Sequence, residues 1–271
     1  MKTIYSIFAF PLILNAIAWY FKWDYLVSVN FVLGGITLLL TLNSIKVFTK
    51  NDWKLFGGIS VFSNIFTFFV EVIMLKFDVW GFSSQHTRLL GITAFGAPIE
   101  EYIFWMYCPW LVGFTYIICA RSGIDKTIDP KLLTLITKPL AKLEELKKAA
   151  IQDEVKYTSD TTTSGQYSRG NKFPVYLSIQ LILLGMVVYL KKLYHGSWRS
   201  MLLTLGLFFF TMMPYEQYAI SQGFWTYNAN KMIGLFFLKV PFEGWLMYIL
   251  PPIAGAMFTD VCSRKFFGKD I

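Results

Sequence analysis

Charged side chains are scarce in this sequence. Asp, Glu, Lys and Arg together make up 15% of its 271 residues, and hydrophobic residues make up 55%. Because a soluble globular domain carries about 25% charged residues, the composition argues against a soluble protein. Seven apolar segments are each close to the ~20 residues that a helix needs to cross a bilayer, so we predict an all-α polytopic membrane protein. These segments are residues 4–21, 25–46, 55–76, 97–120, 174–194, 199–221 and 240–263.

Several residue types and motifs that bind cofactors are also missing. The two histidines, His86 and His195, are too few for a histidine-box iron site, which excludes desaturase and hydroxylase chemistry of that kind. No G-x-G-x-x-G or P-loop motif supports a flavin, nicotinamide or ATP site. A single D-x-x-x-D pattern, Asp125 to Asp129, is one acidic cluster fewer than a Mg²⁺-dependent prenyltransferase needs. We therefore predict no cofactor and no metal.

Positive charge is concentrated in one stretch. The net charge is +8, and residues 121–172 hold ten of the 25 Lys and Arg residues. The positive-inside rule predicts that this stretch is a cytoplasmic loop of a protein in the cell (inner) membrane, with no role in nucleic-acid binding. Within it, residues 130–150 are expected to form an amphipathic surface segment and residues 153–172 a flexible linker. Seven crossings would then leave several later basic residues outside, among them Lys191 and Arg264.

A pattern of acids, aromatic residues and prolines occurs twice. In each copy a Glu precedes a Trp by nine residues, and a Gly precedes a Pro by seven. The copies are Glu71, Trp80, Gly91, Pro98 and Glu100, and then Glu216, Trp225, Gly234, Pro241 and Glu243. Matched offsets over this many positions predict an internal duplication. We divide the chain into an extra helix (1–24), a first repeat (25–121), a linker (122–172) and a second repeat (173–271).

Three spans in each repeat predict that the repeats have opposite orientations in the membrane. The acids of the first repeat and those of the second would then lie near opposite membrane faces. This expectation depends on a linker that returns to the face from which it started.

The repeated acids have two possible roles. Pro98 and Pro241 are typical of the first residue of a helix, which places Glu100 and Glu243 in a first turn where a carboxylate either caps the helix or serves chemistry. Glu101 adds a second acid in the first copy. Glu71 and Glu216 lie inside apolar segments, where an acid is a functional candidate or hydrogen-bonds to a neighbouring helix. The aromatic residues nearby are either membrane anchors or stabilisers of a cation; they are Trp80, Phe82, Phe224, Trp225 and Tyr227.

With these motifs in view, the sequence resembles the membrane-embedded lycopene cyclase family. Its members carry, in both halves, an acid nine residues before a Trp and a Gly seven residues before P-x-E-[E/D]. The first copy matches fully at residues 98–101, although Ser83 stands where Asn is usual. The second copy has G-F-W-T-Y-N at residues 223–228 but ends Pro241-Phe242-Glu243-Gly244, so that Gly244 replaces the second acid. The resemblance covers residues 25–120 and 174–264.

Membership would imply an intramolecular lyase or isomerase that forms cyclic end groups on a carotenoid without redox change. The resemblance implies Glu100 or Glu101 as proton donor, Glu71 as its partner, and Glu243 with Glu216 as a second set. It also implies a hydrophobic isoprenoid substrate, the bilayer as surroundings and association with other carotenoid-pathway membrane enzymes. The residues expected to contact substrate are Trp80, Phe82, Phe104, Trp225, Tyr227, Asn228 and Trp245. We expect each acid set to serve one end of a long substrate.

Three other readings stay open. Gly244 is compatible with a different membrane terpenoid cyclase or a hydratase. Broken helices in a repeated scaffold are also compatible with a transporter that catalyses nothing. Lys239, near the last span, suggests a retinal protein, but its place before Pro241 is typical of a loop end.

Overall fold

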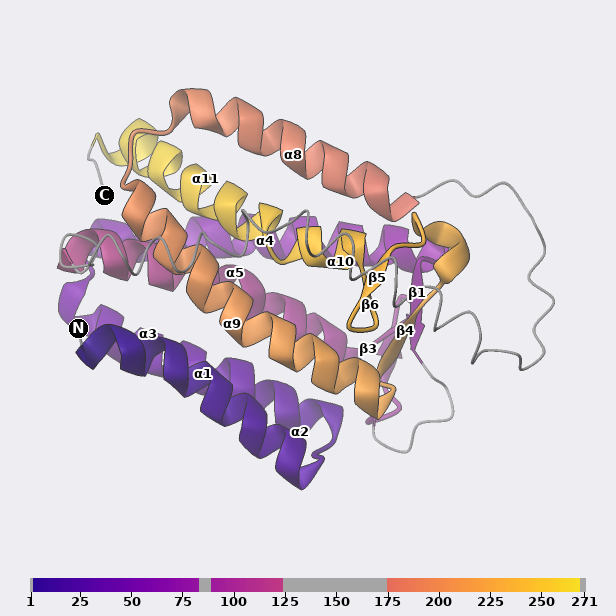
Figure 1. The fold of residues 1–271 in the computed structure, drawn as a ribbon. Coiled ribbons are helices and arrows are strands. Elements are labelled where there is room, and N and C mark those ends of the chain that lie inside the picture. Colours follow the sequence, from indigo (N-terminus) through magenta and orange to yellow (C-terminus); the bar gives the residue numbers. More distant parts are fainter. Residues whose placement is uncertain (1, 83–88, 124–174, 269–271) are drawn as a thin grey trace, which may run out of the picture.

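The computed structural model describes residues 2–82, 89–123 and 175–268, and it is mostly helical (Figure 1). The helices of the first half are α1 (Lys2–Phe21), α2 (Tyr25–Val29), the π-helix η1 (Asn30–Gly34), α3 (Gly35–Val47), α4 (Lys50–Lys76) and α5 (Ile99–Ser122). Those of the second half are α8 (Val175–Leu193), α9 (Trp198–Gln222), the 3₁₀ turn η3 (Ala229–Lys231), α10 (Phe242–Met247) and α11 (Leu250–Phe267). Every predicted apolar segment therefore coincides with a helix.

Within the part of the chain that the structure describes, five helical stretches are long and apolar enough to cross a membrane. They are Tyr25–Val47, Lys50–Lys76, Ile99–Ser122, Val175–Leu193 and Phe242–Phe267. Helix α9 is not among them, although it has 25 residues. It packs against α1, α5 and α11, so most of its surface touches protein and its sequence need not be as apolar as that of a lipid-facing helix. Five of the seven predicted spans are therefore supported.

The helices form one bundle whose outer faces are apolar. Helix α5 packs against α3, α4, α9 and α11 in the middle of it. On the outside, large apolar side chains such as Phe62 and Phe69 of α4 and Ile182 of α8 are more than half exposed. Small residues allow close approach inside, because a Cβ on Gly113 would lie 3.2 Å from the ring of Phe56. This distribution is the one expected of a bundle surrounded by lipid.

Short strands, which an all-α prediction does not include, gather at one end of the bundle. Two hairpins, β2 (Thr93–Ala94) with β3 (Ala97–Pro98) and β5 (Phe236–Phe237) with β6 (Val240–Pro241), precede α5 and α10. The strands β1 (Trp80–Phe82) and β4 (Trp225–Tyr227) pair antiparallel, with Trp80 opposite Tyr227 and Phe82 opposite Trp225. Residues 82 and 227 therefore lie at the same end, and the expectation that the two acid sets lie near opposite faces is wrong.

The error lies in the assumed return of the linker. Arg121, at the end of α5, forms an ion pair of 3.0 Å with Asp52 at the start of α4, far from the strands. Tyr176, at the start of α8, contacts the ring of Trp80 at 5.4 Å. The chain between α5 and α8 thus joins opposite ends of the bundle, and the two halves run in the same direction. The predicted amphipathic and flexible segments of this linker lie outside the described residues.

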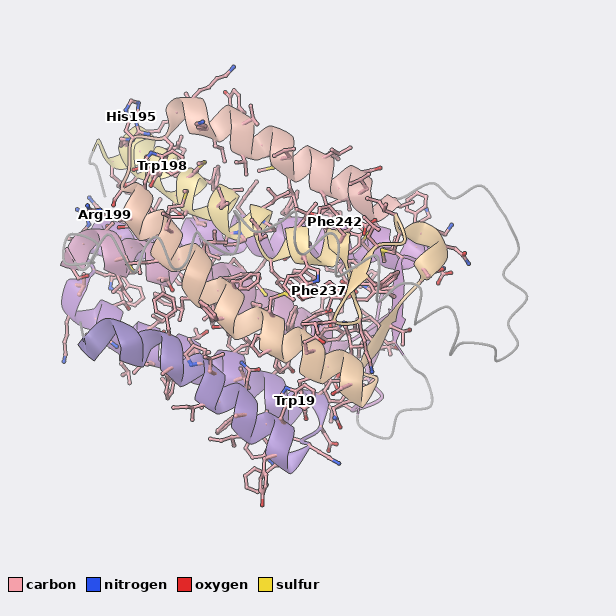
Figure 2. All side chains as sticks on the ribbon, viewed as in Figure 1. Trp19, His195, Trp198, Arg199, Phe237 and Phe242 are labelled. Carbon is pink, nitrogen blue, oxygen red and sulfur yellow. The ribbon has the colours of Figure 1, made fainter. Side chains whose placement is uncertain are left out.

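Basic residues gather at the end opposite the strands. His195, Trp198 and Arg199 mark that end in Figure 2, whereas Phe237 and Phe242 mark the strand end. The last turns of α3, α5, α8 and α11 add further cations there, namely Lys46, Arg121, Lys191, Lys192, Arg264 and Lys265. The conflict with the positive-inside rule that seven crossings created is therefore absent in this arrangement.

Candidate active site

The candidate site is a cavity at the strand end of the bundle, lined by eleven residues. Seven of the residues proposed from the sequence line it: Trp80, Phe82, Glu101, Phe104, Glu216, Trp225 and Tyr227. Four further residues complete the lining: Trp105, Tyr176, Met247 and Tyr248. Two carboxyl groups in an otherwise mostly aromatic wall can exchange protons with a hydrocarbon while few water molecules are present.

The prolines that precede the acids hold the chain extended. Pro98 and Pro241 have nearly identical dihedral angles, φ −65° and ψ 149° against φ −64° and ψ 153°, and each is the residue just before its helix rather than the first residue in it. Glu100 and Glu243 still fall in the first turns of α5 and α10, as predicted.

Glu100 and Glu243 face away from the cavity and hold loops. One oxygen of Glu100 accepts a hydrogen bond of 2.6 Å from the backbone N–H of Leu90, and one oxygen of Glu243 accepts a bond of 2.6 Å from that of Ile233. Both side chains are fully buried, and neither lines the cavity. Each acid therefore ties the loop before its hairpin to the start of its helix. This is a structural role, but it is not the capping of the helix that the sequence left open, because the donors are loop N–H groups and not those of the first helical turn.

Glu71 lies behind the cavity wall. Its Oε1 accepts from the indole N–H of Trp80 at 3.1 Å, and its Oε2 accepts from that of Trp105 at 3.0 Å. An indole N–H only donates, so both oxygens act as acceptors, and this environment suits an ionised carboxylate. The side chain is 0% exposed.

Glu216 is held in the same way but reaches the cavity. Its Oε1 accepts from the Trp225 indole at 3.1 Å and from the Tyr227 hydroxyl at 2.6 Å, and its Oε2 accepts from the Tyr248 hydroxyl. Burial and the neighbouring Glu216 carboxylate raise the pKa of Tyr227 well above its usual value. The phenol therefore keeps its proton and remains a donor to Glu216.

Of the two acids that line the cavity, Glu101 accepts fewer hydrogen bonds than Glu216. Its Oε2 accepts a hydrogen bond from the hydroxyl of Tyr25, which comes from the first turn of α2. The ion pairs reported among the described residues, Arg121 with Asp52 and Arg264 with Asp260, lie at the other end of the bundle. The carboxyl groups at the cavity are thus balanced by hydrogen bonds rather than by these cations.

Glu71 and Glu216, called the deep acids below, receive hydrogen bonds from residues at matched positions in the two halves. Trp105 and Tyr248 each follow their proline by seven residues, and each donates to the second oxygen of the deep acid of its own half. This spacing was visible in the sequence but was not used, so both residues were missed. Tyr25 and Tyr176 carried no such signal, because they enter the site from helices distant in sequence.

Two residues expected to touch substrate do not line the cavity. The amide of Asn228 donates to Asp78 at 2.7 Å and its oxygen caps the turn η3. The indole of Trp245 donates to the carbonyl of Phe237 at 3.2 Å and thereby braces the second hairpin. Lys239 lies in the turn of the same hairpin with a φ of 64°, at a loop end as expected.

Comparison with known proteins gives one family. A family model described as lycopene cyclase matches residues 23–118 and 173–261, which include the four glutamates of the repeated pattern and the neighbouring Glu101. No curated protein and no solved structure matches the chain. The matched segments cover more than half of the sequence and coincide with its two halves. The chain belongs to the lycopene cyclase family.

Proposed function

We propose that this protein is an integral membrane carotenoid cyclase that converts a linear end group of a lycopene-type substrate into a ring. The observation that carries the proposal is the convergence of Glu101 and Glu216 on one aromatic cavity at the end of a lipid-facing bundle. Family membership supports the same substrate class. No electrons are exchanged, so the reaction is that of an intramolecular lyase or isomerase.

Glu101 is the proton donor in this proposal. Its protonated carboxyl group adds a proton to the terminal double bond of the end group, which leaves a carbocation on the more substituted carbon. An internal double bond attacks this cation and forms the ring bond, and the positive charge moves to the ring. A neutral acid is favoured at Glu101, because three carboxyl groups near one apolar cavity repel one another when all are ionised.

Glu216 and Glu71 are the stabilising carboxylates. Glu216 reaches the cavity, so it is placed to remove the proton that restores neutrality and forms the ring double bond. Glu71 lies one layer deeper and offsets positive charge through Trp80 and Trp105. The ring faces of Trp80, Phe104 and Trp225 add attraction for the cation. Exclusion of water prevents capture of the cation as an alcohol.

The cavity is one site that holds two acids, Glu101 and Glu216, so it is suited to one end group at a time rather than to both ends of a carotenoid. The remaining polyene chain would extend between helices or into the hydrocarbon of the bilayer. The earlier idea that each acid set serves one end of the substrate at its own membrane face is thereby replaced by one site for one end.

The two halves, residues 25–121 and 173–271, are proposed to descend from a duplication and to lie parallel in the cell membrane. The basic end would be cytoplasmic by the positive-inside rule, and the cavity would lie toward the opposite face.

Expression in cells that accumulate lycopene tests the proposal. The parent chain is expected to yield cyclic carotenoids, and Glu101→Gln is expected to lower their formation by roughly 10²- to 10⁴-fold, as for loss of a general acid. Glu100→Gln is the matched control on the neighbouring residue and should lose far less turnover per folded molecule. An unchanged pigment profile with verified membrane expression would refute a carotenoid cyclase, and hydroxylated products would indicate a hydratase instead.

A further inference from the structure

Two tyrosines, Tyr25 and Tyr176, occupy matched places in the two halves. Tyr176 lines the cavity, whereas Tyr25 lies behind Glu101, which lines it. Tyr25 begins α2 and packs edge-on against Trp225 at 5.5 Å, and Tyr176 begins α8 and packs edge-on against Trp80 at 5.4 Å. Each of these tryptophans donates to the deep acid of its half. The tyrosines are 0% and 2% exposed. Each therefore belongs to one half of the chain and contacts the tryptophan of the other half.

The two halves differ in the residue that could serve as an acid partner to the tyrosine. Tyr25 donates to Glu101, the third residue after Pro98. The third residue after Pro241 is Gly244, on α10, which packs against the helix that carries Tyr176. Gly244 has no side chain, and a Cβ there would lie 2.7 Å from Cγ1 of Val240. The second half therefore has the tyrosine but neither the acid nor the space for one.

The hydrogen bond from Tyr25 decides which oxygen of Glu101 can carry a proton. In a neutral carboxyl group one oxygen is an acceptor and the other bears the hydrogen. Because the phenol donates to Oε2, Oε2 is held as the acceptor and the transferable proton is held on Oε1. Without Tyr25 the proton would be distributed over both oxygens and over more orientations of the carboxyl group, and a small misplacement of a reacting group lowers the rate strongly.

We infer that Tyr25 and Glu101 form a single proton-delivering arm, in which Tyr25 is a positioning residue, and that the matched half around Tyr176 and Gly244 cannot start a cyclisation. This inference rests on the proposed function. It deepens that function in one respect: one end group is cyclised in each binding event, and a substrate with two linear ends must leave and return reversed before its second ring forms.

Removal of each hydroxyl in turn tests the inference. Tyr25→Phe is expected to lower turnover by roughly 10- to 100-fold with little change in the substrate concentration at half-maximal rate. Tyr176→Phe deletes the same atom from a matched place and should lose at least ten times less. Tyr116→Phe, a buried tyrosine at the basic end that contacts Tyr194, is the control for loss of a buried hydroxyl and should leave turnover unchanged. In a Glu101→Gln background, Tyr25→Phe should cause no further loss.

An infrared measurement separates this inference from the proposed function. The carbonyl stretch of a protonated carboxylic acid depends on the hydrogen bond that its oxygen accepts. A band that disappears in Glu101→Gln should shift in Tyr25→Phe and stay in place in Tyr176→Phe, whether or not the chain is given substrate. Equal rate losses in the two tyrosine variants, no loss in either, or a band unmoved by Tyr25→Phe would overturn the inference. A parent chain that makes no cyclic product would refute the proposed function, and the infrared band would then decide the Tyr25–Glu101 pair by itself.

Discussion

Replacing Trp80 or Trp225 by phenylalanine removes one hydrogen-bond donor from Glu71 or Glu216, respectively. The two carboxylates are left with different numbers of donors, so the two variants can be compared. Trp80→Phe takes from Oε1 of Glu71 the hydrogen bond that it has in the structure, and Glu71 is fully buried. Trp225→Phe takes a bond of the same 3.1 Å length from Oε1 of Glu216, but the Tyr227 hydroxyl still donates to that oxygen. Both changes remove the same atoms, so the difference between them isolates the cost of an unpaired carboxylate oxygen.

The size of this difference follows from the hydrogen bond. A bond to a charged group contributes about 1.5–3 kcal/mol, so Trp80→Phe should lower the free energy of unfolding by about 2 kcal/mol more than Trp225→Phe does. For a chain of this size, 1 kcal/mol corresponds to roughly 2–4 °C in the unfolding temperature, which gives a difference of roughly 4–8 °C.

The three cysteines provide the assay. Cys108, Cys119 and Cys262 are buried and unpaired with one another, so a dye that fluoresces on reaction with thiols reports unfolding in detergent without relying on tryptophan emission. As a check, Glu71→Gln in the Trp80→Phe chain should restore part of the lost stability, since an amide needs no charge-assisted donor. Equal shifts in the two tryptophan variants, or a larger shift in Trp225→Phe, would refute the description of Glu71 as an ionised acid held by two indoles.

Three further results are expected. Gly244→Ala should lower the free energy of unfolding by about 1–3 kcal/mol through overpacking against Val240, and Val240→Ala in the same chain should recover much of it; thermal unfolding measures both. Cysteines introduced at the exposed positions Lys46 and Lys192 should react with an impermeant reagent from one side of the membrane and a cysteine at Ala229 from the other. Labelling of positions 46 and 229 from the same side, with position 192 labelled from the other, would contradict the parallel arrangement of the halves. In a time course with lycopene, a product with one ring should precede the product with two, whereas simultaneous appearance would contradict one cyclisation per binding event.

Much of the secondary structure followed from the sequence, for a simple reason. In a hydrocarbon environment the backbone must satisfy its own hydrogen bonds, so each long apolar segment is restricted to a helix. The place of Glu100 and Glu243 in a first turn also followed, because a proline before a helix fixes the chain direction locally. These are local constraints, and they depend little on what lies around the segment.

The direction of the two halves relative to each other could not be predicted correctly from the sequence, because it depends on the chain between α5 and α8. The nine basic residues between α5 and α8 suggested a loop on one face, yet the end of α5 and the start of α8 lie at opposite ends of the bundle. A count of spans therefore assigned opposite orientations, and the acids were placed at two faces instead of one. Composition could not correct this, since charge bias acts on short loops and constrains long ones weakly.

Sequence alone determined that this is a helical protein of the lycopene cyclase family with repeated acids in apolar surroundings. Which acids reach the cavity was decided by the tertiary structure. Glu100 and Glu101 are neighbours in sequence, but successive residues of a helix point about 100° apart, so one holds a loop and the other lines the cavity. The partners that distinguish them, Leu90 and Tyr25, come from a loop and from another helix, and only the packing of α2 against α5 brings Tyr25 to Glu101.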